Sequence, residues 1–247
     1  MADKSSYSDL ENGPFDLDKG SSFTDAAQRS GFARKVLAHV TWMLGIVFLI
    51  NLAAFHASAA TLHYLQGQGA WVYWVATIIA FFLILAYMCH PSLYHHHPQK
   101  YITLLVFAAA IGTLCMYATL QYQAHTVLLA AGLTLCSTAG LALYAHRTRR
   151  DFTLMGAGLS TALLLLLAVG LLQIWFRDQL LQTLVAAGGA LLFSVYIVYD
   201  MQLILGGTHR KYQFDIDDDA LAAISLFLDI VNLFLSLLEL LGGRGDR

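Results

Sequence analysis

The chain has 247 residues, of which 58% are hydrophobic and 12% are charged, and its formal net charge is −2. Soluble proteins average roughly 45–50% apolar and about 25% charged residues, so this composition excludes an ordinary soluble globular protein. The near-neutral charge gives no reason to expect a nucleic-acid partner. The composition instead indicates an integral membrane protein, in direct contact with the lipid bilayer.

Apolar segments of about 20 residues, enough to cross a ~30 Å hydrocarbon core as helices, follow one another along the chain. The sequence therefore predicts an all-α protein. Residues 1–30 are polar and acidic, and we expect a disordered cytoplasmic tail there, followed by one seven-span membrane domain over residues 31–247. The spans are expected at 36–55, 71–89, 102–120, 127–144, 152–172, 181–205 and 220–241.

The orientation is predicted from the Lys and Arg residues of the short loops, because these residues favour the cytoplasmic side. Basic residues precede the first span and follow the second, fourth and sixth spans, whereas the alternate loops hold Arg177 alone. We therefore expect a cytoplasmic N terminus and, with seven spans, a C terminus on the far side. A re-entrant last segment would place both ends in the cytoplasm, and the sequence leaves that alternative open.

The last span carries a stripe of polar residues. Their spacing of three and four residues places them on one face of a helix whose other positions are mainly Leu, Ile, Val and Phe. The stripe consists of Ser225, Asp229, Asn232, Ser236 and Glu239. A carboxylate at mid-bilayer costs about 2.5 to 3.5 kcal/mol on insertion scales, so the stripe should face the protein interior. We therefore expect the last helix at the centre of the bundle.

A second acidic residue inside the membrane is Asp200, near the end of the sixth span. Measured from the same side of the bilayer, the depths of Asp200 and Asp229 differ by only about 6 Å. Two carboxylates in contact at low dielectric cannot both ionise cheaply, so such a pair would tend to share one proton. This arrangement suits a proton sensor or a transient cation site. Alternatively, each aspartate bonds a neighbouring backbone or hydroxyl group and only fixes helix packing.

Two motifs near the C terminus carry a family resemblance. VYDMQLILGG at 198–207, followed by LAAISLFLDIVNLFLSLLELLGG at 221–243, resembles the signature of the transmembrane Bax inhibitor motif family, and most of all its Lifeguard and Golgi anti-apoptotic branch. The resemblance extends to RRDFTLMG at 149–156, to residues 71–89 and to FARKVLAHVT at 32–41. It covers nearly the whole chain beyond the first 30 residues.

The resemblance implies a helical bundle in which the last helix is wrapped by the other six. It also implies a passive calcium leak in which Asp200 and Asp229 form a pH-sensitive pair and bind calcium transiently, with no cofactor besides the transported ion. On the same basis we expect an endoplasmic reticulum or Golgi membrane, with the plasma membrane as an alternative, and suppression of cell death by lowering stored calcium. Candidate protein partners are Bcl-family proteins and other calcium channels.

The chain departs from the family pattern at two places. After the second span, where relatives often carry acidic and Arg-rich residues, this chain has CHPSLYHHHPQK at 89–100, so a basic latch for Asp200 would have to come from His90 or Lys100. Before the last span, DIDDD at 215–219 replaces the SPEEY-like sequence of the family. These acids either favour a helix N terminus by complementing its dipole or form a calcium-attracting mouth.

The sequence also bears on functions other than a calcium leak. A non-conducting membrane regulator that binds another calcium channel or Bcl-family proteins would need the same packed helices and polar centre, so the sequence leaves it open. An intramembrane aspartyl protease is disfavoured because Asp229 lies in LFLD and not in GxGD, and we do not expect an enzyme. A metal site at residues 95–97, three consecutive histidines, is disfavoured because successive side chains of an extended loop point in alternating directions.

Overall fold

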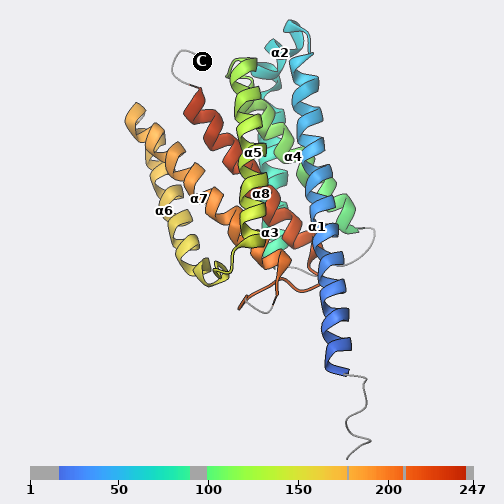
Figure 1. Cartoon of the computed structure of the whole chain (residues 1–247). Helices are drawn as coiled ribbons and strands as arrows, with labels where there is room; N and C mark the ends of the chain where they lie inside the picture. Colours follow the sequence, from blue (N-terminus) through green and yellow to red (C-terminus); the bar gives the residue numbers. More distant parts are fainter. Residues whose placement is uncertain (1–16, 90–98, 177, 208–209, 243–247) are drawn as a thin grey trace, which may run out of the picture.

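The computed structural model describes residues 17–89, 99–176, 178–207 and 210–242 (Figure 1). Within these residues the chain forms eight α-helices and two short 3-10 helices, and it forms no strand. Seven of the α-helices described there are long and apolar enough to cross a membrane. The predicted all-α fold with seven membrane helices is confirmed.

The helices begin and end close to the boundaries predicted for the spans, with α1 as the exception. Their bounds are α1 Leu17–Phe55, α2 Ala59–Gln66, α3 Trp71–Cys89, α4 Gln99–Thr119, α5 Ala124–Arg147, α6 Gly156–Trp175, α7 Gln179–Leu205 and α8 Asp219–Leu241. The 3-10 helices η1 Gln68–Ala70 and η3 Thr153–Met155 precede α3 and α6. Local capping fixes some of these boundaries: the Asp178 carboxylate accepts a hydrogen bond from the Leu181 N–H at the start of α7.

Helix α1 is longer than the sequence predicts. It begins at Leu17, so residues 17–30, where the composition predicts a disordered tail, lie in this helix. A polar segment buries too little apolar surface to fold alone, but extending an existing helix costs far less than starting one. Figure 1 shows the beginning of α1 projecting beyond the other helices. Residues 1–16 lie outside the described part of the chain.

Helix α8 occupies the centre of the bundle (Figure 1). Helices α1, α4, α5 and α7 pack directly against it, while α3 packs mainly on α4 and α6 mainly on α7. The membrane segment of α8 is 56% buried by protein, whereas that of α6 is 6% buried. The contacts are partly consistent with the expected central position of the last helix, because four of the other six membrane helices pack against it while α3 and α6 pack mainly on α4 and α7.

The apolar core lies where α1, α4, α7 and α8 meet. The ring of Phe107 on α4 meets that of Phe227 on α8 edge to face, with 6.1 Å between the ring centroids, and both residues are almost completely buried. A small residue brings α1 and α4 together: a Cβ atom on Gly112 would lie 3.2 Å from the Cα of Val47. The close approach of these two backbones therefore depends on glycine.

The bundle has two ends, which differ in their polar contacts. At the end where α8 begins, called the Asp219 end here, the chain leaves α7 through Gly206, whose φ of 58° favours glycine. The guanidinium of Arg29 on α1 donates hydrogen bonds to the carbonyl oxygens of Leu203 and Phe214 at this turn. The α7–α8 connection is thus attached to the first membrane helix.

Candidate functional site

Asp200 and Asp229 lie side by side in the interior of the bundle. Asp200, near the end of α7, is 5% exposed, and Asp229, on α8, is 8% exposed. The two carboxyl groups lie near enough to interact with each other. A hydrogen bond between them requires a proton on one of the two groups, because a carboxylate only accepts hydrogen bonds. The structure therefore brings the two intramembrane acids together as one pair.

Two tyrosine side chains lie near the pair. Tyr196 interacts electrostatically with both acids, and Tyr199 interacts with Asp200. The second oxygen of Asp229, Oδ2, is buried and has no hydrogen-bond partner among the described residues. Buried polar atoms are usually paired, so this oxygen is available to a proton, a water molecule or a cation.

Two of the remaining stripe residues make hydrogen bonds, one within α8 and one with α7. Asn232 donates from Nδ2 to the Leu228 carbonyl oxygen at 2.8 Å, within α8 itself. Glu239 accepts a hydrogen bond at 2.7 Å from Nε2 of Gln182 on α7. The four residues of the stripe other than Asp229 are partly buried; they are Ser225, Asn232, Ser236 and Glu239. The stripe therefore supplies polar contacts along α8 away from lipid.

Lys100, one of the two candidate latches for Asp200, has a different partner in the structure. Its Nζ lies 3.0 Å from Oδ1 and 3.1 Å from Oδ2 of Asp219, the first residue of α8. Both residues are buried, at 2% and 1% exposure. His90, the other candidate, lies outside the described residues. The ion pair thus joins the start of α4 to the start of α8.

Two residues of α1 complete this group, which is called the Asp219 cluster and consists of Lys35, His39, Lys100 and Asp219. Lys35 Nζ lies 3.1 Å from Asp219 Oδ2, and His39 Nδ1 lies 3.7 Å from the same oxygen. The sequence reasoning missed the cluster because it treated Asp219 as one of four similar aspartates before the last helix. The available signal was the i, i+4 spacing of Lys35 and His39, which places both on one face of α1.

On the α7 side of the Asp219 end, the α5–α6 loop is attached by Gln202, which is fully buried. Its Oε1 accepts a hydrogen bond from the Phe152 N–H at 2.8 Å, and its Nε2 donates to the Arg150 carbonyl oxygen at 3.0 Å. The motifs RRDFTLMG and VYDMQLILGG are therefore in direct contact. Gln202 anchors the loop two residues after Asp200, one member of the acid pair.

Asp151 organises the same loop. It accepts hydrogen bonds from the backbone N–H and hydroxyl of Thr153, at 3.0 and 2.6 Å, and from the Lys211 N–H at 2.9 Å. Burial alone would raise the pKa of Asp151, but these hydrogen bonds and the nearby charge of Arg210 outweigh it, so the pKa is lowered. Asp151 is therefore a stable anion that joins the α5–α6 and α7–α8 loops.

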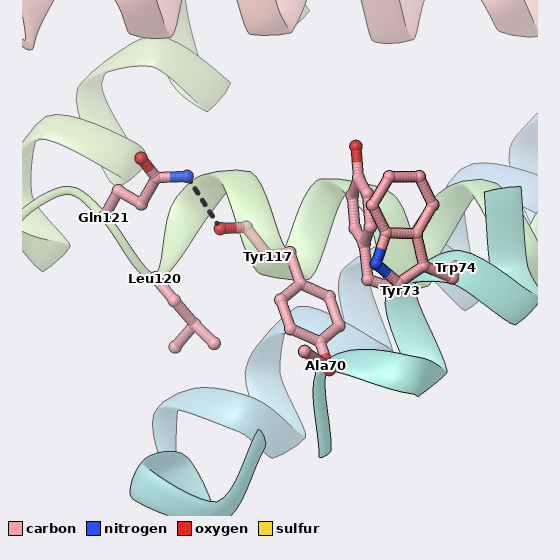
Figure 2. A pocket seen from close by; sticks show the side chains of 6 residues that line it. All are labelled: Ala70, Tyr73, Trp74, Tyr117, Leu120 and Gln121. Carbon is pink, nitrogen blue, oxygen red and sulfur yellow. Dashed lines mark hydrogen bonds between the residues drawn. The ribbon is translucent and has the colours of Figure 1, made fainter. Parts of the chain in front are cut away.

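A pocket lies at the opposite end of the bundle, between the start of α3 and the end of α4 (Figure 2). Figure 2 shows the rings of Tyr73 and Trp74 beside that of Tyr117. The lining residues are Ala70, Tyr73, Trp74, Tyr117, Leu120 and Gln121. None of them carries a carboxylate, so this pocket offers a cation no opposite charge, and we do not assign the ion pathway to it.

A resident metal site is a separate question from transient calcium binding. Among the described residues, no group of three or more His, Cys, Asp and Glu side chains is placed to hold a metal ion. The three consecutive histidines at 95–97 lie outside these residues. Two carboxyl groups alone provide fewer oxygens than the six to eight that calcium prefers. Calcium at Asp200 and Asp229 would therefore be cargo that keeps part of its water shell.

Comparisons with known proteins agree along most of the chain. A family model described as inhibitor of apoptosis-promoting Bax1 matches residues 29–246. The Golgi anti-apoptotic protein of Vaccinia virus (strain Lister) is 31% identical over 249 residues, which cover 98% of this chain and 97% of the relative. Protein lifeguard 4 of Mus musculus is 31% identical over 219 residues, 86% of this chain and 85% of the relative. Protein LIFEGUARD 4 of Arabidopsis thaliana is also 31% identical, over 230 residues.

The matched region includes the structural features described above other than the start of α1. It begins at Arg29, the residue of α1 that bonds the turn after α7, and it extends through the Asp219 cluster and the pair formed by Asp200 and Asp229. It contains all seven helices that are long and apolar enough to span a membrane, apart from the first turns of α1. The chain therefore belongs to the Bax inhibitor motif family of multi-pass membrane proteins.

Proposed function

We propose that this protein is a pH-sensitive calcium leak channel of an internal membrane, which lowers stored calcium and thereby suppresses cell death. The observation that carries the proposal is the contact between two buried carboxyl groups on adjacent helices, Asp200 and Asp229. The names of the relatives, a Golgi anti-apoptotic protein and lifeguard proteins, support the anti-apoptotic part and a Golgi membrane. The endoplasmic reticulum is the alternative compartment.

The cost of the acid pair supports a functional role. Each carboxylate at mid-bilayer costs about 2.5 to 3.5 kcal/mol on insertion scales, and apolar side chains would pack the same helices without that cost. A pair that shares one proton carries one negative charge, and losing that proton leaves two charges that attract a divalent cation. Proton and calcium would then compete for the same oxygens, which makes calcium passage depend on pH.

The orientation belongs to the same proposal. Basic residues gather in the loops of the Asp219 end, where Arg149, Arg150, Arg210 and Lys211 lie, and such loops favour the cytoplasmic side. The N terminus would then be cytoplasmic. The acid pair would lie nearer the cytoplasmic face, since Asp200 is only five residues before the last residue of α7.

Calcium flux through the purified protein in liposomes tests the proposal. We expect the parent to release trapped calcium at a rate that changes between about pH 5 and 8, and we expect Asp229→Asn to alter both the rate and its pH dependence. Leu235→Ala, a partly buried apolar position on the same helix, is the matched control and should change stability alone.

Two outcomes of this experiment decide between the candidate functions. A parent protein that passes no calcium at any pH would contradict the channel and favour a non-conducting regulator of another calcium channel or of Bcl-family proteins. A conducting parent whose flux matches that of Asp229→Asn at every pH would keep the channel but remove Asp229 from its path. In cells, lower stored calcium should accompany expression of the parent and not of a non-conducting variant.

A further inference from the structure

Two basic side chains of α1 reach the same oxygen of Asp219. Lys35 Nζ lies 3.1 Å from Oδ2, and His39 Nδ1, one helical turn along α1, lies 3.7 Å from it. Lys100 Nζ also contacts this oxygen, at 3.1 Å. Lys100 donates a hydrogen bond to Oδ2, and Lys35 forms an ion pair with the same oxygen. At 3.7 Å, Nδ1 of His39 lies beyond hydrogen-bond distance of Oδ2 in this arrangement.

The ring of His39 is held in place beside Asp219. His39 is 5% exposed, and its ring lies against Trp42, with 6.2 Å between the centroids, and against Tyr101, with 5.6 Å. Its Nδ1 is buried and has no hydrogen-bond partner among the described residues. Since buried polar atoms are normally paired, this nitrogen indicates a second arrangement of the cluster in which it has a partner.

The two lysines differ in their freedom to leave. The side chain of Lys35 is 44% exposed, so its ammonium group can move into water. The side chain of Lys100 is 3% exposed and holds both oxygens of Asp219. A further positive charge inside the cluster would therefore displace Lys35 and leave Lys100 in place.

We propose that the Asp219 cluster is a second proton-binding site, at which protonation of His39 replaces Lys35 as the α1 partner of Asp219. The charged and titratable groups that face His39 are Lys35 on α1, Lys100 and Tyr101 on α4, and Asp219 on α8. When His39 is neutral, the formal charges of the two lysines and the aspartate give the cluster a net charge of +1. Protonation of His39 raises this net charge to +2. The exposed lysine then leaves, and the imidazolium N–H donates to Oδ2.

The exchange moves the contact between α1 and α8 by one helical turn, about 5.4 Å along α1. Histidine suits this role because its charge changes between about pH 5 and 8. The site is separate from the pair formed by Asp200 and Asp229, and the exchange does not depend on whether the protein conducts calcium. A failure of the flux experiment would therefore leave this proposal untouched.

Thermal unfolding of the purified full chain in detergent tests the exchange through Lys35. At about pH 8, Lys35→Met should lower Tm by a few degrees, because Lys35 is then bound to Asp219. At about pH 5.5 the same substitution should lower Tm much less, because Lys35 is already in water. Arg34→Met removes the neighbouring exposed cation of α1, and its effect should be the same at both pH values.

The histidine is tested by repeating the comparison in a His39→Gln background. There Lys35→Met should lower Tm equally at both pH values, because nothing displaces Lys35. Nuclear magnetic resonance of the parent with labelled histidines should also show a His39 ring signal, identified by its absence from His39→Gln, that titrates between about pH 5 and 8.

Either of two results would overturn the exchange. One is a Lys35→Met substitution that lowers Tm by the same amount at both pH values in the parent background. This comparison does not need the His39→Gln protein, so it tests the exchange even if that variant does not fold. The other is a His39 signal that does not change over the same pH range.

Discussion

Lys100 of α4 and Asp219 of α8 form a buried ion pair in which one ammonium group contacts both carboxylate oxygens, at 3.0 and 3.1 Å. Their side chains are 3% and 1% exposed, so water screens the pair very little. Because Asp219 is the first residue of α8, the pair fixes the beginning of the central helix against α4.

Asp219→Asn should strongly destabilise the protein. The substitution leaves the ammonium of Lys100 buried without its anion, and removing one partner of a buried ion pair typically costs about 3 to 5 kcal/mol. The double variant Lys100→Met with Asp219→Asn should recover much of this loss, since the buried ammonium is gone and the remaining partner, Lys35, is 44% exposed and can turn to water. Unfolding of the purified protein in detergent measures both effects. A loss below about 1 kcal/mol for Asp219→Asn would mean that the pair behaves like an exposed one.

Asp200 and Asp229 should titrate as a coupled pair. Two interacting acids release their protons in two separate steps, whereas a single acid has one step. Infrared spectra of the carboxyl C=O band should show two steps in the parent and one step, at a different midpoint, in Asp200→Asn and in Asp229→Asn. A titration curve that is unchanged in both variants would show that the two carboxyl groups do not interact in the membrane.

Cysteine labelling should show that the Asp219 end faces the cytoplasm. The native cysteines at positions 89, 115 and 136 are first replaced. A cysteine at Gln123, between α4 and α5, should react with an impermeant thiol reagent from the luminal or extracellular side, and one at Thr148 from the cytoplasm alone. Both positions flank α5, which makes each the control for the other. The reverse pattern would overturn the orientation derived from the Lys and Arg residues.

Asp151 should make stability depend on pH in the acidic range. Its pKa is lower in the folded protein than the ordinary value of 3.8, so its stabilising effect is fully present above that value and is lost as the pH falls through the folded pKa. Asp151→Asn should therefore be less stable than the parent at neutral pH, by on the order of 1 kcal/mol, with the difference shrinking below about pH 4.

Unfolding of both proteins in detergent across this range checks the prediction for Asp151. A difference between parent and Asp151→Asn that stays constant from neutral to acidic pH would argue against the role of the carboxylate.

The spans and the central helix could be predicted because their signals are local. A segment length of about 20 apolar residues and a spacing of three and four polar positions both lie within single helices. The contact of Asp200 with Asp229 was also within reach, since two consecutive antiparallel helices return the chain to the same depth. The partner of Lys100 could not be predicted from the sequence, because Lys100 and Asp219 are separated by 119 residues and meet only through the packing of α4 on α8.

Two further features could not be predicted from the sequence, for a related reason. The helical start of α1 at Leu17 depends on the packed helix that follows it, so the composition of residues 17–30 alone indicated disorder. Gln202 is part of the motif VYDMQLILGG, but its hydrogen bonds are made to backbone groups of the α5–α6 loop. A single sequence does not indicate which backbone groups a side chain will bond.

The central position of α8 also determines the order in which the protein can be assembled. During synthesis the helices enter the membrane from α1 onward, so α1, α4, α5 and α7 are all inserted before the helix that they pack against exists. Until α8 arrives, Lys100 has no anion, and Asp200 has no second carboxyl group. The earlier helices can already pack on one another, as α1 does on α4 and α5 on α7, but the ion pair of Lys100 and the pairing of Asp200 are completed only when the last helix is inserted.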